Sequence, residues 1–197
     1  VIFIALSLYI IKKGGVLLFK SSLQLSKATE VHYEHPKAAV KLSNAISSMV
    51  ESPFIIFCIG TDRCIGDCLG PLVGYELVKN HFPYPVYGTL EHPIHAINLA
   101  EKLAAVRFHH PNLPILALDA SLGKYQSVGN LQFKHGAISP GKGVGKILPE
   151  VGDYSLIGIV DTYNHFDELT IHQVRFHLIH QMAQVVTKSL FLAMEKK

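Results

Sequence analysis

The sequence predicts an α/β protein in which a mostly parallel, twisted sheet lies between two layers of helices, a three-layer α/β/α arrangement. Three short segments, 54–59, 85–90 and 114–118, have the character of strands, and the first and third are unbroken apolar runs. Stretches with apolar residues at helical spacing separate them. Strands that alternate with helices in this way form parallel sheets covered on both faces.

Helices are expected before and between these strands. The first opens at His35-Pro36 and ends at Ser52-Pro53, because proline is tolerated in the first turn of a helix but not in its interior. The second is expected over 67–81 and the third over 93–107. The expected buried face of the third helix consists of apolar residues at helical spacing: Ile94, Ile97, Ala100, Leu103 and Ala104.

The second half of the chain continues the sheet. We expect an edge strand over 127–134, a glycine-rich loop over 136–152 and a buried strand over 155–160. A long helix then runs from about Asp167 to the C-terminus. Its expected apolar face is Ile171, Val174, Leu178, Met182, Val185 and Val186.

The first thirty residues fall outside this pattern. The apolar run from Val1 to Ile11 is too short to span a bilayer and lacks the preceding charge and the cleavage site of a signal peptide. Codons for the stretch 12–16 can resemble a bacterial ribosome-binding site, and the chain begins with Val. We therefore expect residues 1 to about 16 to be translated leader, residues 1–30 to lie outside the fold, and a single domain over 31–197.

Composition argues against several classes of protein. The net charge is +3 and the basic residues are scattered, whereas a nucleic-acid-binding protein needs a clustered basic patch. Neither a nucleic acid nor a membrane is therefore an expected partner. Three cysteines, Cys58, Cys64 and Cys68, lie within eleven residues, and this odd number does not suit a disulfide framework. It suits a reducing compartment, so we expect a cytoplasmic location.

The candidate site is a pair of aspartates. Asp67 lies in the loop after the first strand of the α/β pattern, and Asp119 ends the third. If the strands are arranged in the order second, first, third, the order reverses between the first and third strands, and ligands bind in the crevice at such a point. The two carboxylates would then face each other although 52 residues separate them.

Two nearby carboxyl groups tend to share a proton, because both cannot ionise cheaply at short range. Such a pair can activate water for hydrolysis, and it can also bind a divalent metal. Each aspartate has an ordinary structural alternative: Asp67 can cap the following helix, and Asp119 can cap a turn.

Four more residues are candidates for binding substrate. Asp62 and Arg63 lie in the same loop as Asp67, and an arginine there can pair with a carboxylate or with the end of a substrate chain. His95 and Asn98 lie three residues apart near the start of the third helix, close to the expected crevice. Each also has an alternative, as an exposed loop residue or a structural side chain.

These segments together resemble the YyaC family of spore proteases from endospore-forming bacteria. The resemblance runs from about His32 to the last helix. It is carried by Gly60-Thr61-Asp62-Arg63-Cys64-Ile65-Gly66-Asp67-Cys68-Leu69-Gly70-Pro71, Gly88-Thr89-Leu90, Pro93-Ile94-His95-Ala96-Ile97-Asn98-Leu99 and Leu118-Asp119-Ala120.

That family is similar to the spore germination protease and to the hydrogenase maturation endopeptidases, which share a phosphorylase/hydrolase-like fold. The resemblance implies that the functional aspartates of the first group, and the two acidic metal-contacting positions of the second, fall on Asp67 and Asp119. The third metal ligand of the endopeptidases is a histidine in a Ser-Pro-His sequence, and this chain has Ser139-Pro140-Gly141 there. The resemblance therefore does not extend to recognition of nickel.

Three functions remain open from the sequence. The first is an aspartate-dependent peptidase of sporulation or germination that acts on a protein or peptide and requires no cofactor, with the segment 136–152 as a mobile wall of its cleft. The second is a non-catalytic module that binds a peptide or a cation. The third is a hydrolase that depends on a divalent metal held by Asp67 and Asp119. The sequence does not predict the oligomeric state.

Overall fold

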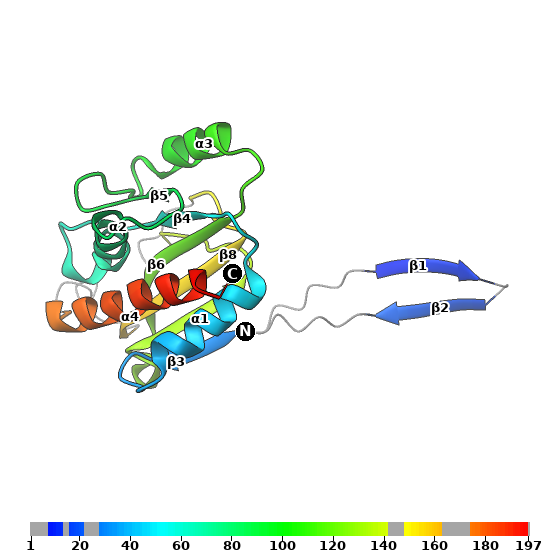
Figure 1. Ribbon diagram of the computed structural model, residues 1–197, viewed down its shortest axis with the longest axis horizontal. Helices are drawn as coiled ribbons and strands as arrows, with labels where there is room; N and C mark the ends of the chain where they lie inside the picture. Colours follow the sequence, from blue (N-terminus) through cyan, green and yellow to red (C-terminus); the bar gives the residue numbers. More distant parts are fainter. Residues whose placement is uncertain (1–7, 14–15, 22–27, 142–147, 163–173, 197) are drawn as a thin grey trace.

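A computed structural model of the protein describes residues 8–13, 16–21, 28–141, 148–162 and 174–196. Two antiparallel strands, β1 (Leu8–Lys13) and β2 (Val16–Ser21), form a small sheet of their own (Figure 1). A separate sheet of six strands begins at Thr29. Among the described residues, no helix has both the length and the apolar character needed to cross a membrane.

The six-stranded sheet has the order β3-β7-β8-β6-β4-β5. Strands β5, β4, β6 and β8 are parallel neighbours, and β7 is antiparallel to both β8 and β3. The bounds of the strands are Thr29–His32 for β3, Ile55–Cys58 for β4, Val86–Tyr87 for β5, Ile115–Gly123 for β6, Asn130–His135 for β7 and Tyr154–Thr162 for β8. The prediction of an α/β protein with a mostly parallel sheet is confirmed.

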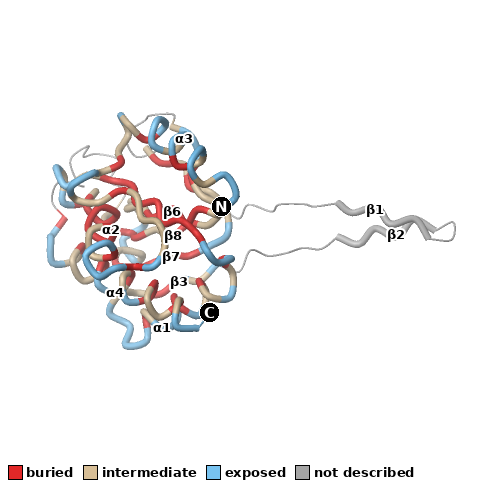
Figure 2. The backbone as a smooth tube through the Cα atoms, turned by 45° about the horizontal axis from the view of Figure 1, so that its top comes forward, coloured by how far each residue is buried: buried red, intermediate tan, exposed pale blue. Residues whose placement is uncertain are grey.

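The sheet is buried on both faces, as the unbroken apolar run of its first parallel strand predicts. In β4, Ile56 and Cys58 belong to one hydrophobic cluster while Ile55 and Phe57 belong to another. Helices α1, α2 and α4 contribute to the first cluster, and α3 contributes to the second (Figures 1 and 2). The helices span Ala38–Met49 (α1), Leu69–Lys79 (α2), Leu99–His109 (α3) and Phe176–Met194 (α4), and two short 3₁₀ turns span Ile65–Asp67 (η1) and Tyr125–Ser127 (η2).

Two strand predictions need correction. β7 is not an edge strand, because β3 pairs with its outer side, and β3 had no strand signal strong enough to be predicted. The strand containing Asp119 does not end there: β6 continues to Gly123 because β8 extends beside it and supplies partners for its backbone groups.

Two helix predictions also need correction. The third helix begins at Leu99, not at Pro93, because the preceding residues form a turn closed by the side chain of Asn98. Its buried residues are Leu99 and Val106, whereas Ile97 is 86% exposed. The last helix begins at Phe176, and its predicted start at Asp167 and the predicted core residue Ile171 lie outside the described residues.

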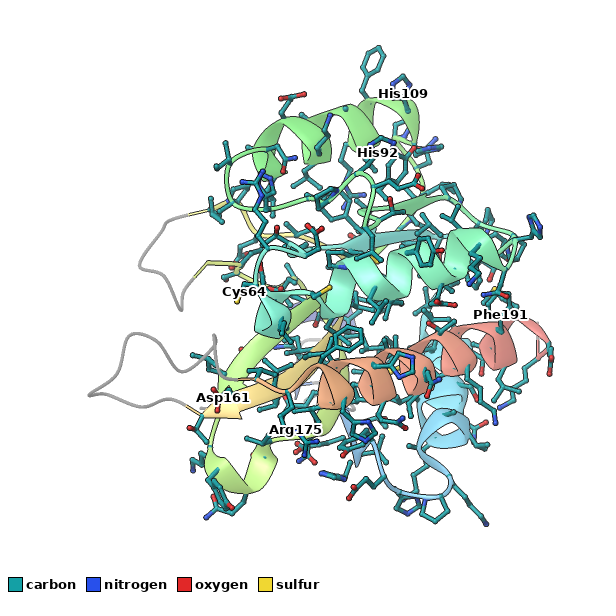
Figure 3. All side chains as sticks on the ribbon, turned by 90° about the vertical axis from the view of Figure 1, so that its left-hand side faces the viewer. Cys64, His92, His109, Asp161, Arg175 and Phe191 are labelled. Carbon is teal, nitrogen blue, oxygen red and sulfur yellow. The ribbon has the colours of Figure 1, made fainter. Side chains whose placement is uncertain are left out.

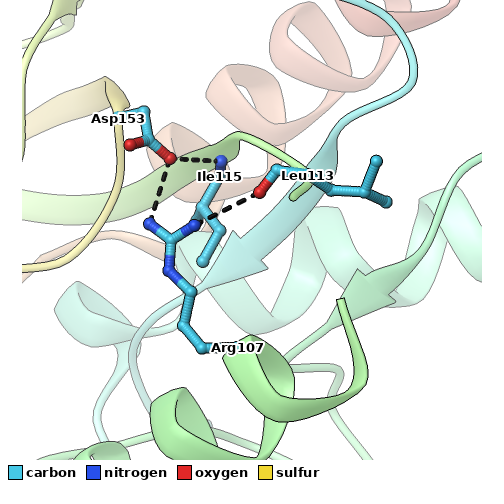
Figure 4. Close-up of polar contacts among 4 residues, drawn as sticks. All are labelled: Arg107, Leu113, Ile115 and Asp153. Atoms are coloured by element: carbon cyan, nitrogen blue, oxygen red, sulfur yellow. Dashed lines mark hydrogen bonds and ion pairs between the residues drawn. The ribbon is translucent and has the colours of Figure 1, made fainter. Parts of the chain in front are cut away.

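A polar cluster closes the amino-terminal edge of the sheet (Figure 4). The guanidinium of Arg107, near the end of α3, donates to the carboxylate of Asp153 at 3.0 Å and to the carbonyl of Leu113 at 3.2 Å. The same Asp153 oxygen accepts from the backbone N–H of Ile115 at 2.8 Å. Arg107 and Asp153 therefore hold α3 and the starts of β6 and β8 in one arrangement.

Candidate functional site

The strand order on which the candidate site depends is the one observed. The second, first and third strands of the sequence pattern are β5, β4 and β6, and they are neighbours in that order. The order therefore reverses between β4 and β6, and the chain leaves β4 into the loop that holds Asp67. The carboxyl ends of β4 and β6 lie together, since Cys58 pairs with Leu118, the residue before Asp119.

Glycines fold the loop after β4 into a tight shape. Gly60 has a φ of +136°, and a side chain there would overlap the backbone oxygen of Asp67. A side chain at Gly70 would likewise overlap the backbone oxygen of Ile59. The backbone N–H of Thr61 donates to the Asp67 carbonyl at 3.0 Å and closes the loop. The glycines at positions 60 and 70 thus allow the tight loop that places Asp67 after the end of β4.

Asp67 is the last residue of the 3₁₀ turn η1 and is half-buried. It does not cap the following helix, because the N-cap of α2 is Cys68. Burial raises the pKa of the Asp67 carboxyl to about 6, while a hydrogen bond from the Thr61 backbone acts in the opposite direction. The Asp67 carboxyl therefore titrates close to neutral pH. A general base is most effective when its pKa lies near the pH at which the enzyme works.

Asp119 lies within β6, opposite Ile157 of β8. Burial raises its pKa well above the usual range of a carboxyl group, and the nearby charge of Asp67 raises it further. One carboxyl oxygen accepts the backbone N–H of Ala120 at 2.9 Å, which lowers the pKa and is the local contact expected for a structural aspartate. This contact occupies one of the two carboxyl oxygens.

The two aspartates are electrostatically coupled. Because the pKa of Asp119 rises with the charge on Asp67, the pair favours a state with a single proton. Burial and the charge of Asp67 both raise the pKa of Asp119, so we expect Asp119 to hold that proton. Asp67 is expected to be ionised above pH 6. Two carboxyls in different states side by side can act as acid and base in one reaction.

The other predicted residues lie around this pair in different ways. Asp62 and Arg63 are exposed, and the backbone N–H of Arg63 donates to the Thr61 hydroxyl at 3.3 Å. His95 is half-buried in a turn next to the site loop, since the Gly60 N–H donates to the carbonyl of Ile94 at 2.7 Å.

Asn98 has a structural role in this arrangement. Its side-chain oxygen accepts from the His95 backbone at 2.8 Å, and its side-chain nitrogen donates to the carbonyl of Pro93 at 3.1 Å. Both polar groups of the amide are therefore engaged in closing the turn before α3. The role of Asn98 in binding substrate stays a prediction, which these local contacts do not test.

Cys68 and Asp161, toward the carboxyl edge of the sheet, carried no predicted role. Cys68 is buried directly after Asp67, and burial, followed by the charges of Asp62 and Asp67, raises the pKa of its thiol. Asp161 lies near the carboxyl end of β8 and pairs with Leu122 of β6. Figure 3 shows Asp161 and Cys64 toward the same edge of the sheet. The sequence feature that could have identified Asp161 as a candidate is its position after a predicted buried strand, the same feature that identified Asp119.

The loop predicted as a mobile wall lies partly outside the described residues. Its two described ends are joined by a bridge between Ile138 and Val151, and Ser139 donates to Glu150 at 3.1 Å. Elsewhere, a hollow of about 670 Å³ lies between α2 and α4, and none of the candidate site residues lines it.

Asp67 and Asp119 are the residues that would offer oxygen ligands to a divalent metal. Within the described ranges, no group of three or more His, Cys, Asp or Glu side chains is arranged to hold a metal ion. Ser139, at the start of the stretch that replaces Ser-Pro-His, is bonded to Glu150.

Comparison with known proteins gives two findings. A family described as a protein of unknown function (DUF1256) matches residues 30–189. An uncharacterized protein, YyaC of Bacillus subtilis (strain 168), is 37% identical over 188 residues, which cover 92% of this chain and 89% of that protein. Residues 30–189 include both candidate aspartates and all of the six-stranded sheet except Thr29.

Proposed function

We propose that this chain, which belongs to the DUF1256 family and is a relative of YyaC, is a hydrolase. It is proposed to cleave peptide bonds with the carboxyl groups of Asp67 and Asp119. One observation supports the proposal above the others. Asp67, from the turn that follows β4, and Asp119, from the neighbouring strand β6, interact electrostatically at the switch point of the sheet, and the pKa of each carboxyl group is raised.

The proposed reaction uses the two groups in complementary states. Asp67, ionised, takes a proton from a water molecule as the water oxygen attacks the peptide carbonyl carbon. Asp119, protonated, donates its proton to the carbonyl oxygen, which gives a neutral tetrahedral diol. Asp67 then gives its proton to the amide nitrogen, the C–N bond breaks, and Asp119 recovers a proton from one hydroxyl of the diol. The products are an amine and a carboxylic acid, and both aspartates return to their starting states.

The substrate is proposed to be a protein or peptide. Asp62 and Arg63 are exposed beside Asp67, where they can contact the charged groups of an extended peptide. His95 lies on the other side of Gly60 and can donate or accept a hydrogen bond. The resemblance noted for this sequence further suggests a three-layer, phosphorylase/hydrolase-like protein that acts in the cytoplasm during sporulation or germination.

Cleavage assays on isosteric variants test the proposal. Purified protein is incubated with spore proteins and with a library of unstructured peptides, and products are identified by mass spectrometry. We expect Asp67→Asn and Asp119→Asn each to lower kcat/KM by about 10³-fold, the size of a general acid or base contribution. Glu101→Gln, which removes an exposed carboxylate on α3 outside the candidate site, is the control and is expected to keep its activity.

Three outcomes would contradict the proposal. Cleavage retained by either site variant would remove the pair from the mechanism. Activity lost on chelation and restored by one divalent metal would mean that the carboxylates act through a cation. A wild-type protein without activity that still binds peptide saturably, with or without the aspartates, would make the chain a binding module.

A further inference from the structure

The hollow between α2 and α4 has the size of a small-molecule site. Its volume is about 670 Å³, and Figure 3 shows the two helices beside each other on the same side of the molecule. Sites that bind small molecules have volumes of roughly 300–1,000 Å³, so this hollow can hold a molecule much larger than a single ion. Both helices cover the face of the sheet opposite α3, and neither Asp67 nor Asp119 lines the hollow.

Part of the lining is apolar. Leu72 and Ala183 are buried, and Phe191, near the end of α4, is half-buried. An edge-to-face contact with Phe82, with 5.3 Å between the ring centroids, holds the Phe191 ring in place. Small-molecule sites combine apolar surface of this kind with a few polar groups that fix the orientation of the ligand. The body of a ligand in this hollow is therefore expected to be apolar.

Two opposite charges also line the hollow, one on each helix. Glu76 of α2 is half-buried, and Lys188 of α4 is exposed. Neither forms an ion pair with any residue that the structure describes. The Glu76 carboxylate accepts one long hydrogen bond, of 3.4 Å, from the side chain of Asn80. Glu76 can therefore pair with an amine of a ligand and Lys188 with a carboxylate, and hydrogen bonds between charged groups are stronger than those between neutral groups.

A third polar group of the lining has no partner. The hydroxyl of Thr187 is buried and makes no hydrogen bond within the described part of the chain. A threonine inside a helix can bond the backbone carbonyl one turn earlier, and Thr187 does not do so. A buried hydroxyl without a partner lowers the stability of the fold, and a polar group of a ligand in the hollow would supply the missing hydrogen bond.

We infer that the hollow between α2 and α4 is a binding site for a short peptide that has free amino and carboxyl ends and an apolar side chain. Such a molecule carries the two charges that Glu76 and Lys188 complement, together with an apolar body. An inorganic ion would leave the apolar lining uncovered, and a fatty acid would leave Glu76 without a partner. The inference does not depend on the proposed hydrolysis, because no candidate site residue takes part.

Calorimetric titration with leucyl-leucine tests the site, and mass spectrometry verifies that the peptide stays intact. We expect a Kd on the order of 0.1–1 mM, the affinity typical of a ligand with so few atoms. The N-acetylated peptide and the peptide amide should each bind about 10-fold or more weakly, because each loses a hydrogen bond between charged groups. Glycyl-glycine, which lacks apolar side chains, should also bind more weakly.

Variants of the two charged residues assign each end of the peptide to its partner. Glu76→Gln should bind leucyl-leucine and its N-acetylated form alike and keep the preference for a free carboxylate. Lys188→Met should show the reverse pattern. The matched controls are Glu101→Gln on α3 and Lys79→Met, an exposed lysine of α2 that does not line the hollow. Both controls should keep both preferences, and circular dichroism verifies that all the variants fold.

Thr187→Val, which removes the hydroxyl and keeps the shape, should weaken binding while its Tm stays the same or rises. Four results would overturn the inference: no binding of leucyl-leucine up to about 10 mM, well above the expected Kd; equal binding of the free and capped peptides; both preferences kept in Glu76→Gln and in Lys188→Met; or binding lost in Asp67→Asn, which would place the peptide at the carboxyl edge of the sheet instead.

Discussion

The two edges of the central sheet use aspartate in opposite ways. At the amino edge, Asp153 accepts from the guanidinium of Arg107 and from the Ile115 backbone, so its charge is balanced and hydrogen-bonded (Figure 4). At the carboxyl edge, Asp119 accepts one backbone N–H, and the charge that acts on it is that of a second carboxyl group, Asp67. The amino edge therefore stabilises the fold, while burial at the carboxyl edge makes two acidic groups costly to ionise, a pattern typical of functional sites.

The largest expected effect on stability concerns how the carboxyl edge is shaped. Gly60→Ala should destabilise the protein by about 3 kcal/mol or more, because the new methyl group overlaps the Asp67 carbonyl and the positive φ is unfavourable for alanine. Gly136→Ala is a matched control, since Gly136 also has a positive φ but nothing lies within 4 Å of the added carbon. It should cost about 1 kcal/mol. Urea denaturation measures the free energy of unfolding of both variants. If both lost the same amount, the close approach of Gly60 to the Asp67 carbonyl would not be what holds the site loop in place.

At the amino edge, loss of the ion pair should come next in size. Arg107→Ala removes the donor to Asp153 and to the Leu113 carbonyl and should lower the free energy of unfolding by about 2 kcal/mol. Lys102→Ala, which removes an exposed pair on the same helix, should change it by less than about 0.5 kcal/mol. If the two variants were equally stable in a denaturation experiment, the amino edge would not be the stabilising one.

At the carboxyl edge, removing a charge should stabilise the fold. The pKa of Asp67 is about 6 in the folded protein and 3.8 in a model compound, so the folded state holds the proton more tightly. Ionisation therefore costs stability, fully above pH 6 and progressively less as the pH falls toward 3.8. Asp67→Asn should raise the free energy of unfolding by about 1 kcal/mol at pH 7.5, a value reduced for partial exposure.

Thermal unfolding at several pH values checks this prediction. The gain should shrink as the pH falls below 6 and should disappear below about pH 3, where the carboxyl is neutral in both the folded and the unfolded wild type. A variant less stable than the wild type at pH 7.5 would mean that the Asp67 carboxylate is favourably bound, and the contrast between the two edges would be lost.

The smallest expected effect is a bell-shaped dependence of kcat/KM on pH. If Asp67 is the base, kcat/KM should fall as the pH drops through about 6, since Asp67 becomes protonated there. It should fall again on the alkaline side as Asp119, whose pKa is raised further by its neighbour, loses its proton. An acid limb near pH 4 instead would show that an unperturbed carboxyl, rather than Asp67, controls the rate.

Much of this architecture follows from local sequence. The apolar run at 54–59 predicts a strand buried on both faces, the alternation of strands with helices predicts a parallel sheet, and the position of Asp67 and Asp119 after two of those strands predicts a shared site. These features depend on patterns within a few residues, which the chain displays before it folds.

Other features depended on contacts between distant segments. Asp119 lies inside a strand because β8 extends along β6, and β7 is internal because β3, about a hundred residues earlier, pairs with it. The predicted buried face of the third helix was right for Ile94 and Leu103 but wrong for Ile97, Ala100 and Ala104, which are exposed. Both sides of this segment are apolar, so only the sheet beneath it selects Leu99 and Val106 for burial. The sequence alone thus determined the buried parallel strands and the two aspartates that follow or lie within them, while the tertiary structure decided strand neighbours, helix faces and pKa values, because these depend on burial and on charges from remote parts of the chain.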